Sequence, residues 1–335
     1  MSGWIRKSGR AGVAAMGRSG GGILVFLVIG AAIMGFVAPV FLTIGNWMNI
    51  FNQSVVLMLV AIGMTFALMG GGIDLSVGSI AALVGATVAW LTGQADAPMW
   101  LALGAGALVG ALLGALNGLV ITRMKIPGFV TTLATMALLR GVLYVWTQGT
   151  PFVGYSNGAF WTLGGLSRIG WGLTVPEIVA AVVAVLGILT LRYTRFGRHL
   201  RAVGDNADVA RLSGVGVKRI KVVSFVISGF TAGIVGILLT GRLGTVQPNM
   251  AMGMEIDALA AAIMGGAALS GGRGSVVGAC LGALTLTVIE NVINILDIPP
   301  VFETLVVGVV ILTVISVDRL VSVYSARSRV AAASG

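Results

Sequence analysis

The sequence predicts an all-α polytopic membrane protein with about ten membrane-spanning helices. Of its 335 residues, 57% are apolar and only 10% are charged, whereas soluble domains carry about 25% charged residues. The apolar residues form long continuous runs, unlike the short alternating strands of a membrane barrel. The 51 glycines agree with this class, because glycine is frequent in membrane helices and lets their backbones approach closely.

The N-terminal part of the chain predicts a basic tail followed by two spans. Residues 1–20 carry four basic side chains, and we expect them to lie in the cytoplasm. The apolar run 23–43 is longer than the core of about 7–15 residues in a cleaved signal peptide. It is therefore expected to stay as the first helix. A second run, 52–70, opens with the polar trio Asn52, Gln53 and Ser54.

A glycine-rich break, residues 70–79, separates the second run from a third one that ends at Leu91. It contains Asp74, and an unpaired acid near the bilayer centre costs roughly 2.5–3.5 kcal/mol on insertion scales. Asp74 is therefore expected either to cap a helix start, with Ser76 nearby, or to face a wet cavity.

The fourth and fifth runs, 100–122 and 129–148, each carry one marked feature. In the fourth, glycines recur every four residues and so share one helix face, which predicts a close-packing seam; they are Gly106, Gly110, Gly114 and Gly118. In the fifth, Arg140 lies within the span. Three roles are open for it: reaching to the interface, pairing with an acid such as Glu290, or lining water.

The second half of the chain predicts five more runs and a basic tail. The run at 258–269 is short. If it and the break near residue 70 are re-entrant, the number of membrane-spanning helices falls to eight or nine. With ten spans, all but three of the 21 basic residues lie on one side of the membrane, which places both termini in the cytoplasm. The three exceptions are Arg140, Arg168 and Arg242. The predicted domains are a tail 1–20, a single transmembrane domain 21–320 and a tail 321–335. The five predicted runs of the second half are 175–191, 222–240, 258–269, 276–296 and 301–317.

The longest strongly polar stretch between two spans is Thr194–Lys221, in a region that holds eight basic residues. It contains a short helix signal: Asp205 or Asn206 as the cap, Asp208 in the first turn, Arg211 in the last, and Gly214 as the stop. Two turns are too short to cross a bilayer. The segment is either a surface that a soluble partner grips or a solvated linker with a chance helix.

Composition and motifs also limit the chemistry. The net charge of +10 lies in loops and indicates topology, so no nucleic-acid partner is expected. We expect no catalytic residue and no metal site, since the chain has one histidine, His199, and one cysteine, Cys280. A faint repeat, residues 69–79 and 264–275, pairs two glycine-rich breaks, and paired interruptions point to a transport pathway.

Four segments resemble the membrane permeases of ribose/xylose/arabinose/galactose-type ABC importers, which are related to branched-chain amino-acid permeases. They keep their order and span most of the chain after residue 50. The segments are GGIDLSVGS (71–79), IPGFVTTLATMALLRG (126–141), FGRHLRAVGDNADVARLSGV (196–215) and GGAALSGGRGSVVGACLGAL (265–284).

This resemblance implies the type II importer architecture of vitamin B12 uptake, in a bacterial inner membrane. It implies a second permease copy or paralogue, cytoplasmic ATPase subunits that grip the loop 194–221 and carry ATP and Mg²⁺, and a periplasmic sugar-binding protein. The expected ATPase-coupling residues are Gly204, Asp205, Asn206, Ala210, Leu212, Ser213 and Gly214. The candidates for the substrate pathway are Asn52, Gln53, Asp74, Ser76, Asn117, Asn291 and Asn294.

The residues themselves agree on one point: the chain lacks the GxxxxGK[ST] phosphate loop, so this motif cannot supply ATP hydrolysis here. Together with this absence, the resemblance implies the permease subunit of an importer for a monosaccharide or related polyol. Two alternatives remain open, a related permease for branched-chain amino acids or nucleosides and an ion-coupled secondary sugar carrier. The second needs buried ionisable groups, and only Asp74, Glu290 and Arg140 qualify.

Overall fold

The computed structural model describes residues 21–153, 162–165, 167–169, 172–299, 302, 305, 308–309 and 312–313. Within these ranges the helices and strands are joined by turns and irregular segments, and the extended elements are one antiparallel pair of two-residue strands, β1 (Phe152–Val153) and β2 (Thr245–Val246). Six of the described helices are long and apolar enough to cross a membrane, so the chain is a multi-pass membrane protein. They are α3 (Ile44–Met69), α5 (Met99–Met124), α6 (Gly128–Thr147), α8 (Val175–Tyr193), α11 (Val217–Leu243) and α13 (Val276–Ile295).

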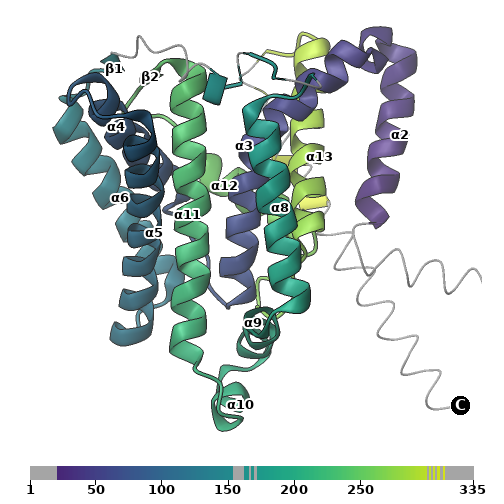
Figure 1. The fold of residues 1–335 in the computed structure, drawn as a ribbon. Coiled ribbons are helices and arrows are strands. Elements are labelled where there is room, and N and C mark those ends of the chain that lie inside the picture. Colours follow the sequence, from purple (N-terminus) through teal and green to yellow (C-terminus); the bar gives the residue numbers. More distant parts are fainter. Residues whose placement is uncertain are drawn as a thin grey trace, which may run out of the picture.

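The remaining described helices are shorter and complete the bundle. They are α2 (Gly21–Val37), the 3₁₀ turn η1 (Pro39–Leu42), α4 (Val77–Gly93), α9 (Arg195–Asp205), α10 (Ala207–Leu212) and α12 (Met254–Met264). Figure 1 shows α11 in the middle of the bundle, with α4, α5 and α6 on one side and α3, α8 and α13 on the other. Helices α9 and α10 extend from one end.

Helices α3 and α11 form the interior of the bundle, and each packs on several neighbours. The apolar stretch of α3 is 78% buried and that of α11 61%, whereas α5, α6 and α8 are each only 22% buried. Helices of the last group therefore present most of their apolar surface outward, as membrane helices facing lipid do.

The predicted glycine seam of α5 is confirmed, because its four glycines are all buried. Two of them lie against the backbone of α11: a β-carbon on Gly110 would lie 2.9 Å from the α-carbon of Gly233, and one on Gly114 would overlap the carbonyl oxygen of Phe225. Backbone thus touches backbone along this interface, the arrangement by which small residues hold membrane helices together.

The faint sequence repeat corresponds to two turns of the same geometry. Helices α3 and α12 both end in Met-Gly-Gly, and the second glycine has a positive φ, +78° at Gly71 and +88° at Gly266. Glycine adopts this conformation without strain. In each turn the following residue donates its N–H to the carbonyl five residues earlier, Gly72 to Ala67 (3.0 Å) and Ala267 to Ala262 (2.9 Å).

The predicted short run 258–269 becomes α12, a helix of 11 residues followed by an irregular segment that leads to α13. Such a helix is about 16 Å long, roughly half of the 30 Å hydrocarbon core. The predicted tails 1–20 and 321–335 and most of the run 301–317 lie outside the described residues. The ten-helix count therefore stays a prediction.

The seam makes a testable prediction about stability. In Gly114→Ala the new β-carbon meets the Phe225 carbonyl, so α5 and α11 must separate, and overpacking of this kind costs about 1–3 kcal/mol. We expect a lower thermal unfolding temperature in detergent. The matched control is Gly104→Ala on the same helix, where a β-carbon meets nothing within 4 Å; an unchanged unfolding temperature in Gly114→Ala would contradict the seam.

Candidate functional site

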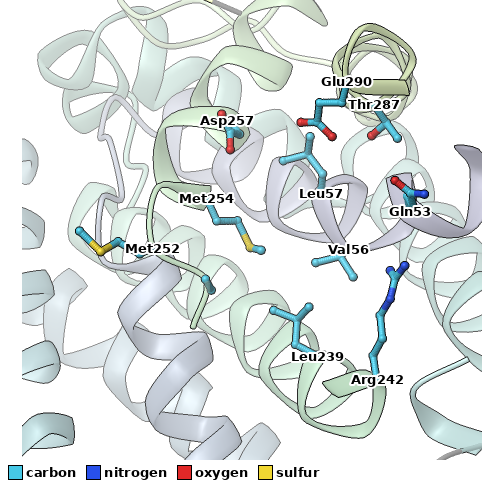
Figure 2. Close-up of a pocket in the computed structure, with 11 residues that line it drawn as sticks. Gln53, Val56, Leu57, Leu239, Arg242, Met252, Met254, Asp257, Thr287 and Glu290 are labelled. Carbon is cyan, nitrogen blue, oxygen red and sulfur yellow. The ribbon is translucent and has the colours of Figure 1, made fainter. Parts of the chain in front are cut away.

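A cavity of about 300 Å³ lies between α3, α11, α12 and α13 and is partly open to the surroundings (Figure 2). The cavity lies far from α10, because the two are at opposite ends of α11. Arg242, which lines the cavity, is next to the last residue of α11, and α10 comes just before its first residue. At 1.5 Å per residue the two ends of α11 are about 40 Å apart. The cavity is lined by Gln53, Val56, Leu57, Leu239, Arg242, Ala251, Met252, Met254, Asp257, Thr287 and Glu290.

The polar groups of the cavity come from four different helices. Figure 2 shows Gln53 of α3, Arg242 of α11, Asp257 of α12 and Glu290 of α13 around the cavity, with Val56 and Leu239 between them. A cavity with a few convergent polar groups on an otherwise apolar wall is the usual form of a small-molecule site. Ionisable groups in membrane helices commonly mark a solute pathway.

Arg140 holds the segment that leads into α12. Its guanidinium donates hydrogen bonds to the carbonyl oxygens of Pro248 (2.6 Å) and Met250 (2.9 Å), and Glu255 adds a favourable electrostatic interaction. The sequence offered an acid such as Glu290 as one possible partner; in the structure the acid that interacts with Arg140 is Glu255, beside the two backbone carbonyls. Arg140 thus fixes the entry to α12, which forms one wall of the cavity.

Asp74, Ser76 and Asn117 form a buried network away from the cavity lining. The backbone N–H and hydroxyl of Ser76 donate to the Asp74 carboxylate at 3.1 and 2.6 Å, and Asn117 donates to the Ser76 hydroxyl at 2.8 Å. Thr135 of α6 then donates to the Asn117 side-chain oxygen at 2.7 Å. The network joins the turn before α4 to α5 and α6. Its three predicted pathway residues have at most 1% of their surface exposed.

The other polar residues predicted for the pathway have varied surroundings. The Asn52 amide donates to the Thr174 hydroxyl at the start of α8 (3.1 Å), and Asn291 exchanges two hydrogen bonds with Asn46 (3.0 and 2.9 Å). Asn294 is exposed at the end of α13. Gln53 is thus the one predicted pathway residue that lines the cavity; the pathway role of the others stays a prediction.

At the opposite end of the bundle the stretch 194–216 forms two helices, of which the sequence predicted only the second. The first, α9, begins where the Thr194 hydroxyl accepts the N–H of Gly197 (3.2 Å). Its apolar residues Leu200 and Val203 are buried, and its basic residues lie on the other face. Such an amphipathic helix lies on an apolar surface with its charges in water.

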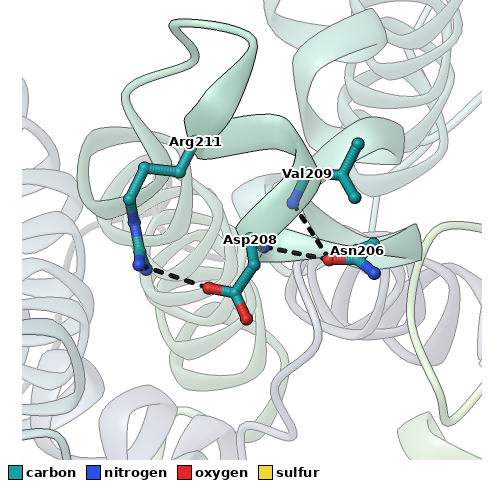
Figure 3. Close-up of polar contacts among 4 residues, drawn as sticks. All are labelled: Asn206, Asp208, Val209 and Arg211. Carbon is teal, nitrogen blue, oxygen red and sulfur yellow. Dashed lines mark hydrogen bonds and ion pairs between the residues drawn. The ribbon is translucent and has the colours of Figure 1, made fainter.

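The second helix, α10, has the predicted cap (Figure 3). The Asn206 side-chain oxygen accepts the N–H groups of Asp208 (3.0 Å) and Val209 (3.1 Å), while Arg211 pairs with Asp208 at 3.2 Å. A carboxylate in the first turn and a cation in the last both favour the helix dipole. Asn206, not Asp205, is the cap, and Gly214 ends the turn with φ +80°.

The side chains of α10 divide into an inner and an outer face. Ala210 is 3% exposed and packs into the cluster beneath the helix, and Ser213 closes the end by donating to the Val209 carbonyl (3.0 Å). Leu212 is 90% exposed on the outer face. An apolar side chain at the tip of a polar protrusion is a common contact for another protein.

The end of α9 packs against the two glycine-rich breaks, 69–79 and 264–275. A β-carbon on Gly204 would lie within 2.2 Å of both the Met69 carbonyl oxygen and the Gly272 nitrogen. Gly272 donates its N–H to that same Met69 carbonyl (3.1 Å), and a β-carbon on Gly272 would overlap the Asp205 carboxylate. We call these three residues (Gly204, Met69, Gly272) the glycine junction. They bring together α9, the last residue of α3 and the segment before α13.

Comparison with known proteins gives the family. Residues 46–315 match the family described as the permease component of branched-chain amino acid transport systems. The chain belongs to this permease family.

The curated relatives of the permease are similar over nearly its whole length. It is 37% identical over 298 residues to the ribose import permease protein RbsC of Haemophilus influenzae, which covers 88% of this chain and 91% of that protein. It is 38% identical over 303 residues to the D-allose transport system permease protein AlsC of Escherichia coli (90% and 92%). It is 36% identical over 300 residues to the L-arabinose transport system permease protein AraH of Escherichia coli (89% and 90%).

Sequence reasoning missed most of the cavity of the permease. The sequence set Arg242 apart only as one of three basic residues away from the cytoplasmic side, and it singled out neither Asp257 nor Thr287. A signal was present in the last helix: Thr287 and Glu290 are three residues apart in an apolar run, so they lie on one helix face. The cavity itself depends on how four helices pack, which no local pattern gives.

The buried network makes a prediction about the permease fold. Asn117→Ala leaves Ser76 without its donor and Thr135 without its acceptor, and buried polar groups left unpaired cost about 1–3 kcal/mol each. We expect a clearly lower thermal unfolding temperature. The exposed Asn294→Ala serves as the control and should change stability by less than about 0.5 kcal/mol; equal stabilities of the two variants would rule out a structural role for Asn117.

Proposed function

We propose that the permease forms the translocation pathway of an ATP-driven importer for a monosaccharide or related polyol. Relatives named for ribose, allose and arabinose match nine-tenths of the chain at 36–38% identity. The observation that best supports ATP-driven transport is the protrusion formed by α9 and α10 (Figure 1), on which Leu212 is exposed. A related permease for branched-chain amino acids or nucleosides would share this mechanism and differ in solute.

The protrusion is the contact for a cytoplasmic ABC ATPase. The Asn206 cap and the Asp208–Arg211 pair hold α10 as a defined shape, and Leu212 supplies an apolar anchor of the kind that fills a partner's pocket. ATP and Mg²⁺ bind on the ATPase subunits, since the permease has no phosphate loop. The proposed coupling residues are Gly204, Asp205, Asn206, Ala210, Leu212, Ser213 and Gly214.

The glycine junction passes the movement of α9 to the spans. Gly204 contacts the backbone at the end of α3 and at the segment before α13, so no flexible side chain lies between these elements. Closely packed elements shift as units rather than deform. A displacement of α10 by the ATPases therefore moves the ends of α3 and α13 together.

The membrane arrangement follows from this assignment. With α10 in the cytoplasm of a bacterial inner membrane, the cavity is toward the outer end, where a periplasmic sugar-binding protein delivers solute. The proposed fold has about ten spans in the type II arrangement of vitamin B12 uptake, with both termini cytoplasmic. Its parts are a tail 1–20, a permease domain 21–320 with the coupling loop 194–221, and a tail 321–335. A second permease copy or paralogue completes the transporter.

A test separates this proposal from an ion-coupled carrier. The permease is reconstituted in vesicles with and without its ATPase and binding protein. Accumulation of monosaccharide should require ATP and both partners. Accumulation by the permease alone, driven by a proton or sodium gradient, would overturn the proposal.

The exposed anchor predicts a loss of partner binding. Leu212→Asp places a charge in a contact that should be apolar, so co-purification of the ATPase and ATP-driven uptake should fall at least about tenfold. Met124→Asp is the control, because Met124 is also exposed, at the end of α5 and away from α10. Normal ATPase binding in Leu212→Asp would exclude α10 as the docking contact.

The glycine junction predicts a different defect. Gly204→Ala forces α9 away from Met69 and Gly272, so uptake should fall while the ATPase still co-purifies, because Leu212 is unchanged. At the control position Gly216, a new β-carbon meets only the Arg219 side chain, at 3.9 Å or more. Uptake in Gly204→Ala equal to that in Gly216→Ala would contradict transmission through the junction.

A further inference from the structure

We infer that the cavity of Figure 2 is a holding site for one neutral polyol of monosaccharide size, a step that rests on the proposed import function. In this site the carboxylates of Asp257 and Glu290 accept hydroxyl protons in hydrogen bonds. Arg242 and Gln53 donate to hydroxyl oxygens. The proposal assigns a solute class and four recognition groups to a cavity that opens far from α10.

The volume of the cavity suits such a solute. About 300 Å³ lies at the small end of the range for small-molecule pockets. The lining is mixed: Val56, Leu57 and Leu239 offer apolar surface to the C–H groups of a sugar ring, and the polar side chains surround them. A polyol has the same two kinds of surface.

The charges of the cavity favour a neutral polyol over an anion or a zwitterion. Two carboxylates and one guanidinium line it, so an anionic solute meets a net negative site. Carboxylates, an amide and a guanidinium together supply acceptors and donors on several walls. Neighbouring hydroxyl groups, each both donor and acceptor, can satisfy these groups at once. An amino acid can pair its carboxylate with Arg242 and its ammonium group with one of the two carboxylates, but leucine brings no further donor for the second carboxylate.

The site is also placed to release its solute when the transporter moves. Gln53 and Met69 belong to the same helix, α3, and Glu290 lies on α13, whose first turn follows the glycine junction residue Gly272. Two walls of the cavity are therefore the far ends of the helices that meet at the junction. A shift there changes the spacing of Gln53 and Glu290. A solute that is imported must be bound weakly enough to leave the site again. A site whose polar groups change their spacing during transport meets this need.

Protection from a thiol reagent tests the site. Met254→Cys, in a Cys280→Ser background, places the only thiol of the chain on the apolar part of the lining, which leaves all four recognition groups intact. The full transporter is placed in nanodiscs, so that a membrane-impermeant maleimide reaches both faces. Millimolar ribose, allose or arabinose should slow labelling, and the same concentration of leucine should not.

Two further variants make the result specific. Adding Glu290→Gln removes a charged acceptor, and we expect about tenfold more sugar to be needed for protection. Gln247→Cys in the same background is the control, because Gln247 is exposed on the segment between β2 and α12 and lies outside the lining. Its labelling should not respond to sugar.

The outcomes separate this site from the proposed function. If the parent transporter imports sugar with ATP but sugar does not protect Met254→Cys, the holding site is wrong and the import function stands. Protection by leucine equal to that by sugar, or an unchanged sugar requirement in the Glu290→Gln variant, also overturns the site. If sugar protects but no ATP-dependent uptake occurs, the site stands and the driven import mechanism fails.

Discussion

The structure depends on a contact between backbones at one end of the bundle, where Gly204 of α9 rests against Met69 and Gly272. Only glycine allows this approach, since a β-carbon at position 204 would overlap both neighbours. The hydrogen bond from Gly272 to Met69 joins the two glycine-rich breaks, 69–79 and 264–275, directly. The element that extends from the bundle, the inner helix α3 and the approach to α13 therefore meet at one point. In the proposed function, a movement of α9 reaches the helices around the cavity through this contact.

The same use of glycine holds the spans together. In lipid no hydrophobic driving force brings helices together, so close backbone contact and polar pairs must do so. The α5–α11 seam supplies the first kind of contact, and the Asp74–Ser76–Asn117–Thr135 network supplies the second. These contacts hold α4, α5, α6 and α11 together. The cavity lies between α11 and the helices α3, α12 and α13.

The sequence predicted those features that depend on local spacing or composition. The seam followed from glycines at every fourth position, and the cap of α10 followed from Asn206, Asp208, Arg211 and Gly214 in their order. Features that depend on contacts between distant segments were not predicted. The hydrogen-bond partners of Arg140 lie more than a hundred residues away in the sequence. Helix α9 was not predicted, because its many charges are typical of a loop. The burial of Asp74 and Asn117 likewise depends on three elements that meet only in the folded chain.

Hydrogen exchange at the glycine junction tests the central claim most directly. The amide of Gly272 is protected by its bond to the Met69 carbonyl, and opening of that contact would expose it. In the assembled transporter, exchange of the segment 265–275 should change between the nucleotide-free and ATP-bound states, while the buried seam of α5 and α11 should not respond. Identical exchange at 265–275 in both states of an actively importing transporter would show that the movement of α9 is not passed on at this point.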